Sequence, residues 1–394
     1  MDAPDYLDFI HTGPGTLAGR YLRMFWQPVY RVKDLASGRA VPIKIMSEDF
    51  TLYRGKSGTP HLTAFRCAHR GTQLSTGWVE GDSIRCRYHG WKYDTTGQCV
   101  EQPGEDSEVQ EFKGSKVEGF KGSKIRSYPM KEYLGLIFAY LGEGEPPPLR
   151  RHLDFEREGV MEVGAPEYWP CNYFNRLDNA CDSAHIAFTH RESGQRTGRT
   201  ERLGIRKVSA EETDYGIKRS YQLPGAPAAF HHFHMPNINQ TRSALRVEGS
   251  LKDAATLTAD RLFWRLPVDD ENCVSFVVDL VSLTGEAAKA YEERRREARE
   301  AVAVSPNAVA QAVLEGKLRL EDVAQELPIY YLFWIEDYVV QVGQGALAPR
   351  DGDTLGRMDQ GVLLLRKIWE RELRALAEGR PLKSWRESGP LMEG

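Results

Sequence analysis

The stretch RCAHRG at residues 66–71 is followed, after a gap, by RCRYHGW at residues 85–91. Each stretch presents one cysteine and one histidine, Cys67 with His69 and Cys86 with His89, in the pattern C-x-H and then C-x-x-H. Thiolates bind iron–sulfur clusters, and two imidazoles in place of two thiolates on one iron raise the reduction potential. Two short loops that each supply one ligand of each kind predict a [2Fe–2S] cluster held by two cysteines and two histidines.

Two alternatives compete with this cluster. Structural zinc also accepts two cysteines and two histidines, but zinc fingers usually pair cysteine with cysteine and histidine with histidine along the chain. Four unrelated residues in β-loops are the other possibility. The glycines that follow, Gly71 and Gly90, argue against it, because they permit tight turns whose amides point toward cluster sulfurs.

The stretch NRLDNACDSAHIAFTH at residues 175–190 carries a second set of metal-binding side chains. Asp178, Asp182 and His185 are spaced i, i+4, i+7, which places them on one face if the segment is a helix. His190 lies five residues further, about 140° around an ideal helix, so the helix must end or bulge between the two histidines. Two histidines and one carboxylate form the facial triad of non-haem iron oxygenases. A surface helix with polar side chains is the alternative, and the upstream cluster motif counts against it.

The two Cys/His loops, together with GWKYD at residues 90–94, resemble the Rieske domain of ring-hydroxylating oxygenases. Gln102-Pro103 is similar to the loop that covers the cluster in that family. Soluble Rieske ferredoxins share the cluster ligands, so this part of the chain by itself does not distinguish an oxygenase from an electron carrier.

The D-x3-D-x2-H-x4-H pattern resembles the catalytic-iron motif of the same family, in particular the group of phthalate dioxygenase and the vanillate or dehydrodivanillate O-demethylases. The resemblance implies that His185 and His190 bind iron and that Asp182 bridges to a cluster histidine. It gives Asp178, where the family often has glutamate, an outer-sphere role. Asn175 is a further candidate beside the iron.

The third iron ligand is expected downstream, in WIEDYVVQ at residues 334–341. This stretch is similar to the segment that carries the carboxylate in phthalate-dioxygenase-like members. The resemblance implies Asp337 as the ligand, with Glu336 as its rival. On a helix the two side chains point about 100° apart, so only one of them can face the iron.

The length of the chain and its pattern of strand-like and helix-like segments predict an α+β protein of two domains. The chain has 394 residues, which suits two domains better than one. We expect residues 1–40 to pack on the catalytic domain, and residues 41–141 to form an all-β Rieske domain of short alternating strands. A polar, Pro-rich linker follows at residues 142–151. The catalytic domain, residues 152–394, should combine an antiparallel sheet with surrounding helices.

Composition excludes several classes of partner. The net charge of −4 gives no basic field for nucleic acid. The sequence contains no run of 18 apolar residues, so it does not predict a membrane span. The polar, acidic N-terminus does not resemble a signal peptide. Six cysteines in a chain of this length are expected to be metal ligands or reduced thiols, so we expect a cytoplasmic protein.

The resemblance implies a terminal oxygenase component that uses O2 and electrons from a reductase or ferredoxin. It would hydroxylate or O-demethylate an aromatic substrate, most simply an aromatic acid related to lignin. The family forms homotrimers in which the cluster of one subunit abuts the iron of the next, so Asp182 would contact His69 or, as we prefer, His89 of the partner subunit. A Rieske electron carrier without oxygenase activity is the alternative, but it leaves His185 and His190 unexplained.

Three further segments are candidates for accessory roles. The aromatic and histidine-rich residues 230–237 are candidates for the substrate pocket. Arg242 and Arg246 could pair with a substrate carboxylate, or they could be ordinary strand residues facing solvent. The repeated FKGSK at residues 112–116 and 120–124 suggests an exposed basic hairpin, or a docking patch for an acidic electron donor.

Overall fold

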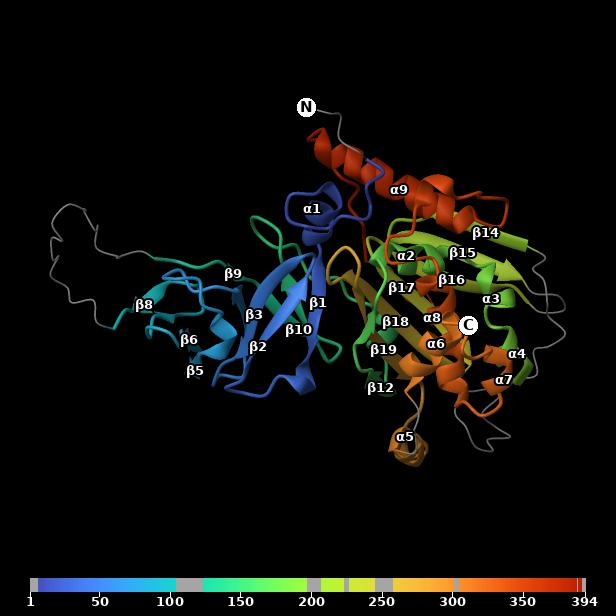
Figure 1. Cartoon of the computed structure of the whole chain (residues 1–394), viewed down its shortest axis with the longest axis horizontal. Helices are drawn as coiled ribbons and strands as arrows, with labels where there is room; N and C mark the ends of the chain where they lie inside the picture. Colours follow the sequence, from blue (N-terminus) through green and yellow to red (C-terminus); the bar gives the residue numbers. More distant parts are fainter. Residues whose placement is uncertain are drawn as a thin grey trace. The chain divides into compact units, whose positions relative to one another are not determined.

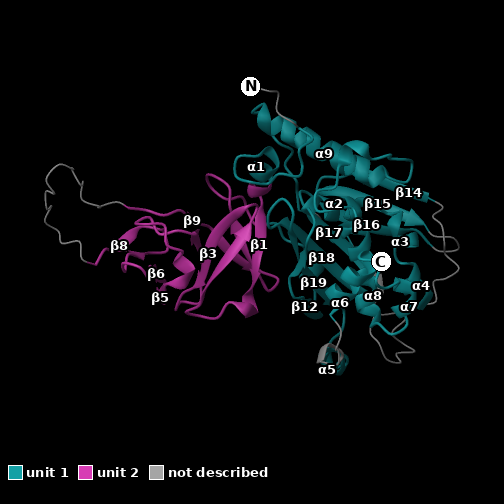
Figure 2. Ribbon diagram, viewed as in Figure 1, with its two compact units in different colours: residues 1–21, 150–394 teal, residues 22–149 magenta. Residues whose placement is uncertain are grey.

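The computed structural model describes residues 6–103, 123–196, 207–222, 227–244, 258–300, 305–387 and 389–391. The chain divides into two compact units, Leu22–Leu149 and Met1–Tyr21 with Arg150–Gly394 (Figure 2). The first division therefore falls at residue 22 and not at residue 41 as predicted, because β1 (Trp26–Arg31) pairs with β11 (Leu136–Tyr140). The second division lies within the predicted linker.

The described part of the 22–149 unit is built from three antiparallel sheets, with strand orders β1-β11-β10, β2-β3-β4-β9 and β5-β6-β7-β8 (Figure 1). The alternating burial that the sequence pattern predicted is wrong for β3, because its residues 50–54 are all buried in succession, and β4 does not alternate regularly either. Leu134 and Gly135 have positive φ and turn the chain from β10 into β11. The remaining bounds are β2 Ala40–Ile45, β3 Glu48–Arg54, β4 Pro60–Ala64, β5 Trp78–Glu80, β6 Ser83–Arg85, β7 Lys92–Tyr93, β8 Cys99–Glu101, β9 Ser127–Tyr128 and β10 Met130–Tyr133.

The other unit centres on an eight-stranded antiparallel sheet, in the order β12-β19-β18-β17-β16-β15-β14, with β13 also paired to β19. Its two longest strands, β18 and β19, are mostly buried and pair with each other along nearly their whole length. The bounds are β12 Val160–Val163, β13 Glu167–Trp169, β14 Lys207–Glu212, β15 Gly216–Gln222, β16 Ala229–His234, β17 Ile238–Ala244, β18 Thr258–Pro267 and β19 Cys273–Val281.

Helices cover this sheet, which confirms the predicted α+β fold (Figure 1). α2 contacts β18 and α8, whereas α9 contacts β14 and β15. α9 begins after Asp359 and ends before Gly379, whose positive φ suits the residue that follows a helix. The helices are α1 Leu17–Arg23, α2 Tyr173–Cys181, α3 His185–Phe188, α4 Arg191–Arg196, α5 Gly285–Glu300, α6 Pro306–Leu314, α7 Leu320–Val323, α8 Ile329–Val342 and α9 Gln360–Ala377.

Within the described residues, no helix is both long enough and apolar enough to cross a bilayer. The FKGSK repeat falls almost wholly outside the described residues, so the predicted basic hairpin is not part of this structure.

Candidate metal centres

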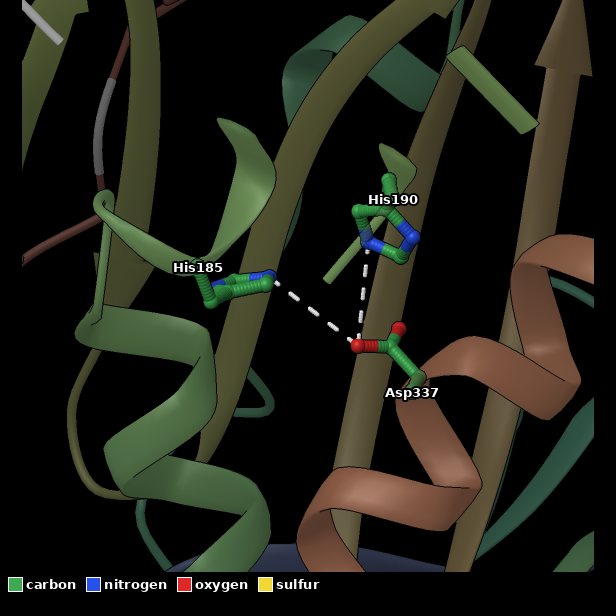
Figure 3. A group of neighbouring side chains, drawn as sticks. All are labelled: His185, His190 and Asp337. Atoms are coloured by element: carbon green, nitrogen blue, oxygen red, sulfur yellow. Dashed lines mark ion pairs between the residues drawn. The ribbon is translucent and has the colours of Figure 1, made fainter. Parts of the chain in front are cut away.

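Three side chains from two distant segments converge in the sheet-and-helix unit (Figure 3). The ligand atoms of His185, His190 and Asp337 all lie within 4.8 Å of one another. Oδ1 of Asp337 lies 3.9 Å from Nε2 of His185 and 3.7 Å from Nε2 of His190. The histidines follow α2, and Asp337 projects from α8. Two imidazoles and one carboxylate are the ligands of a facial-triad iron site.

The chain conformation that brings the histidines together differs in part from the prediction. α2 ends at Cys181, and Asp182 has an extended conformation with ψ 118°, so the predicted single helix through Asp182 and His185 is wrong. A second break was predicted between His185 and His190, and this one is confirmed because α3 ends at Phe188. The two breaks turn both imidazoles toward α8.

Each imidazole has a carboxylate beside its other nitrogen. Nδ1 of His190 lies 3.1 Å from Oε2 of Glu336, and Nδ1 of His185 lies 3.7 Å from Oδ2 of Asp182. Glu336 is buried, and it also accepts hydrogen bonds from the amide and the hydroxyl of Ser193. The hydrogen-bonded carboxylate of Glu336 holds the proton on Nδ1 of His190 and leaves its Nε2 free as a ligand, whereas Nδ1 of His185 is too far from Asp182 for a hydrogen bond. Glu336 and Asp337 thus lie on opposite sides of His190, and Asp337 is the one that faces both Nε2 atoms.

Asp337 is held by two amides that the sequence did not single out for this purpose. Nε2 of Gln341 donates to Oδ1 of Asp337 over 3.1 Å, and Nδ2 of Asn179 donates to the same atom over 3.4 Å. Burial raises the pKa of the Asp337 carboxyl, but its interactions with the imidazoles of His190 and His185 and with nearby arginines outweigh burial and lower the pKa below its ordinary value. Gln341 could have been found from its spacing, because it follows Asp337 by one helical turn.

Asp178 and Asn175, for which a role near the iron was predicted, form hydrogen bonds with residues that follow α8 in the chain. Asp178 accepts hydrogen bonds from Arg350 over 3.1 Å and from Arg366 over 2.8 Å. Oδ1 of Asn175 accepts from Arg350, and its amide donates to the carbonyl of Gly345. Since α2 ends before the histidines, these side chains point from the helix toward residues 345–366 and fasten it there.

The Cys/His loops occupy the other unit, one after β4 and the other between β6 and β7. In both loops a glycine with positive φ, at Gly71 and Gly90, donates its amide to the carbonyl of the cysteine four residues earlier. Cys67 and Cys86 are buried, at 3% and 2% exposure, and belong to one core cluster. The two predicted cysteine ligands therefore lie together in the core of this unit.

The histidines of these loops lie together nearer the surface. The rings of His69 and His89 are 4.5 Å apart between centroids, and His69 stacks on Trp91. Pro103 lies against Gly90, since a Cβ there would come within 3.1 Å of the proline ring. This agrees with the expectation that residues 102–103 cover the second loop.

A single zinc ion does not suit these four side chains. Within the described parts of the chain, only His185, His190 and Asp337 have ligand atoms close enough together to hold one ion. The Cys/His set is spread more widely, which fits a two-iron cluster. The hydroxyl of Tyr93 lies 3.1 Å from Sγ of Cys67 and accepts the amide of Ala68, so its own proton is free to point at the sulfur.

Comparisons with known proteins agree with both sites. Residues 25–129 match the model of the Rieske [2Fe-2S] domain, and residues 169–302 match that of the vanillate O-demethylase oxygenase C-terminal domain. The 5,5'-dehydrodivanillate O-demethylase oxygenase subunit of Sphingobium sp. is 27% identical over 94% of this chain and 80% of its own length. The phenoxybenzoate dioxygenase subunit alpha of Ectopseudomonas oleovorans is 27% identical over 93% of this chain and 84% of its own.

The chain belongs to the Rieske non-haem iron oxygenases. Solved structures share the fold at low identity. Dicamba monooxygenase matches with a TM-score of 0.60 at 19% identity, over 92% of this chain and all of the other. The oxygenase of carbazole 1,9a-dioxygenase, solved with its ferredoxin, matches with a TM-score of 0.63 at 18% identity, over 95% and 97% of the two chains.

This Rieske oxygenase chain is accordingly an oxidoreductase and the terminal oxygenase component of its system, not an electron carrier alone. Its cofactors are a Rieske [2Fe–2S] cluster and a mononuclear non-haem iron. The alternative of a zinc-stabilised scaffold is wrong for this family.

The predicted pocket segment of this oxygenase divides between the two faces of its sheet. β16 alternates, so His232 and His234 point away from His231. Nδ1 of His232 lies 2.7 Å from the hydroxyl of Tyr215, and Nε2 of His234 lies 2.7 Å from Oε1 of Gln240. These two histidines therefore belong to a buried polar network on the side opposite His231.

The arginines predicted to bind a substrate carboxylate are not free to do so or are not described. Arg242 already forms two hydrogen bonds to the buried carboxylate of Asp260, of 2.6 and 3.1 Å. Arg246 lies outside the described residues.

Proposed function

We propose that this oxygenase hydroxylates or O-demethylates an aromatic substrate, an aromatic acid of the kind that lignin yields. Two relatives that align with nearly the whole chain support this proposal, one named for O-demethylation of dehydrodivanillate and the other for dioxygenation of phenoxybenzoate. Reduced mononuclear iron supplies the activation of O2. The protein contributes the ligands, their orientation and the delivery of electrons.

The observation that carries the proposal is the convergence of His185, His190 and Asp337. We assign iron binding to Nε2 of each histidine and to the Asp337 carboxylate. Three protein ligands on one side of the ion leave other positions open for O2. Glu336, hydrogen-bonded to Nδ1 of His190, fixes that imidazole in the orientation that this site requires, and Asp182 lies 3.7 Å from Nδ1 of His185.

The second set, Cys67, Cys86, His69 and His89, is assigned to the [2Fe–2S] cluster. The buried thiols and the half-buried imidazoles are arranged as this cluster needs them. An electron donor, a reductase or a ferredoxin, would approach from the histidine side.

Electron delivery to the iron is proposed to occur between subunits of a homotrimer. Asp182 is partly exposed, and its Oδ1 accepts the amide of Ala184 while Oδ2 faces His185. It can therefore link His185 to His89 of the partner subunit. Light scattering that gave a monomer at working concentration would contradict this assembly. A cytoplasmic location is proposed from the six cysteines, all of which are unpaired.

Metal analysis together with an oxygen-uptake screen tests the function. About three irons and two acid-labile sulfides per chain are expected, with a Rieske optical spectrum. With a surrogate reductase, at least one aromatic acid should accelerate O2 consumption and give a hydroxylated or demethylated product by mass spectrometry. A stoichiometry of about two irons, or uptake without product from every aromatic acid, would contradict the proposal.

A further inference from the structure

Arg219 is a buried arginine in which two of the three guanidinium nitrogens form no hydrogen bond within the described residues. It lies on β15 and is only 3% exposed. Nη2 donates to Oδ1 of Asn239 over 3.0 Å. Nε and Nη1 are buried and have no hydrogen-bond partner among the described residues. A buried guanidinium with unmet donors is costly unless an anion or other acceptor completes it.

The strand register places Arg219 on the face of the sheet that α2 covers. Arg219 pairs with His231 of the next strand, and residues directly opposite each other share a face. Asn239 and Phe263 continue this face across β17 and β18. Two residues after Phe263, Arg265 donates to the carbonyl of Arg176 in α2. The face that carries Arg219 is thus turned toward the helix that leads to the iron ligands.

Electrostatic neighbours connect Arg219 to the triad. Burial lowers the pKa of His231, and the positive charges of Arg219 and then His185 lower it further. Burial also lowers the pKa of Arg219, and the Asp182 carboxylate is among the groups that act against this. His231 therefore lies within electrostatic reach of both the unsatisfied guanidinium and an iron ligand.

Other buried arginines do not offer the same site. Arg176 and Arg265 each leave a single nitrogen without a partner, and both are engaged with helices: Arg176 donates to Gln341, and Arg265 to the Arg176 carbonyl. Arg242 is neutralised by Asp260. Arg219 alone combines two open donors with a position on the triad's side of the sheet, within the described residues.

We propose that Arg219 binds the carboxylate of an aromatic-acid substrate and thereby orients its ring toward the iron site, an inference that rests on the function proposed above. A guanidinium presents two parallel N–H donors that match a carboxylate, and such a pair is strongest where water is excluded. His231 pairs with Arg219 across the strands and thus lies beside the guanidinium, and the ring of Tyr221 meets the His231 ring edge-on at 5.4 Å.

Binding measurements on the intact holoprotein test this assignment. The probes are 3-methoxybenzoate, vanillate and 3-phenoxybenzoate, each compared with its primary amide by calorimetric titration. We expect the wild type to bind at least one acid about 10- to 100-fold more tightly than its amide. Arg219→Gln should abolish that preference while changing amide affinity less than about twofold, and Arg219→Lys should retain part of it.

The controls separate this inference from the proposed function and from misfolding. Arg242→Gln removes an arginine from the opposite face and should keep the acid preference. The Rieske spectrum and the affinity for the amide show whether Arg219→Gln is folded. If this variant does not fold, the acid preference of the wild type and of Arg219→Lys still tests the assignment. The assignment is wrong if the wild type binds acid and amide equally, if none of the three acids binds, or if Arg219→Gln keeps the preference. Each of these results is compatible with oxygenase activity, which metal analysis and O2 uptake with uncharged aromatic substrates would still demonstrate.

Discussion

Oε2 of Glu336 lies 3.1 Å from Nδ1 of His190, and the neighbouring residue, Asp337, faces Nε2 of the same ring. Two consecutive carboxylates of α8 therefore act on opposite nitrogens of one imidazole. His185 also has a carboxylate on each side, Asp182 and Asp337, but its Nδ1 lies 3.7 Å from Asp182 and forms no hydrogen bond to it. Carboxylates behind ligand histidines fix the tautomer and strengthen the metal–nitrogen bond.

The first prediction concerns Glu336→Gln. The amide can still lie against His190, but it lacks the charge that holds the Nδ1 proton, so affinity for the mononuclear iron should fall about 10- to 100-fold. Competition with a ferrous chelator measures the affinity, and the Rieske absorption reports the cluster independently. Glu372→Gln is the matched control, because Glu372 is equally buried but pairs with Arg371 on α9. Equal iron loss in both variants would show that Glu336 only stabilises the fold.

Ligand types and spacing in the sequence indicated the two metal centres, and the resemblance to the family supplied Asp337 as the third iron ligand. The C-x-H and C-x-x-H loops fit few kinds of metal site other than a Rieske cluster. His185 and His190 likewise fit few kinds of site other than a non-haem iron centre. The helix end at Asp182 could not be predicted, because the i, i+4, i+7 spacing fits an unbroken helix equally well. Helix geometry likewise shows that Glu336 and Asp337 cannot share a role, but the rotation of α8, set by packing, decides between them.

Long-range pairing explains the other differences. The unit boundary at residue 22 depends on β1 pairing with β11, more than a hundred residues away in the chain. Arg219 and Arg242 look alike in the sequence, since both are single arginines in strand-like stretches. Only the assembled sheet shows that Arg242 meets a buried aspartate whereas Arg219 is buried with open donors.

A second prediction separates Asp178 from the iron site. Asp178 pairs with Arg350 and Arg366, and all three side chains are mostly buried. Asp178→Ala leaves both guanidinium groups without this partner, so the free energy of unfolding should fall by about 1–3 kcal/mol. Urea denaturation measures the change. Asp353→Ala, which removes a more exposed partner of Arg366, should cost less than about 1 kcal/mol. If Asp178→Ala kept its stability but lost its iron, the outer-sphere role first expected for it would stand.

A third prediction concerns the hydroxyl of Tyr93, which lies 3.1 Å from Sγ of Cys67. A hydrogen bond to a ligand sulfur stabilises the reduced cluster, so Tyr93→Phe should lower the reduction potential by an amount on the order of tens of millivolts. Spectroelectrochemical titration of the cluster measures it. Tyr53→Phe removes a hydroxyl from the same core that donates to the Asp82 carbonyl instead. Similar shifts in both variants would mean that the sulfur contact is not responsible.

The last prediction concerns His232, whose Nδ1 lies 2.7 Å from the Tyr215 hydroxyl in the buried network behind the sheet. Burial, and then the charge of Lys218, lowers the pKa of His232 to about 4. Between about pH 6.5 and 4 the unfolded chain binds a proton that the folded chain does not, so stability falls as the pH is lowered through this window, by up to ~1.4 kcal/mol per pH unit. Urea denaturation at several pH values should show a shallower slope for His232→Gln than for the wild type. His11→Gln, at an exposed site, should keep the wild-type slope. If the pH dependence of stability were the same in His232→Gln as in the wild type, groups other than His232 would be responsible for the loss of stability in acid.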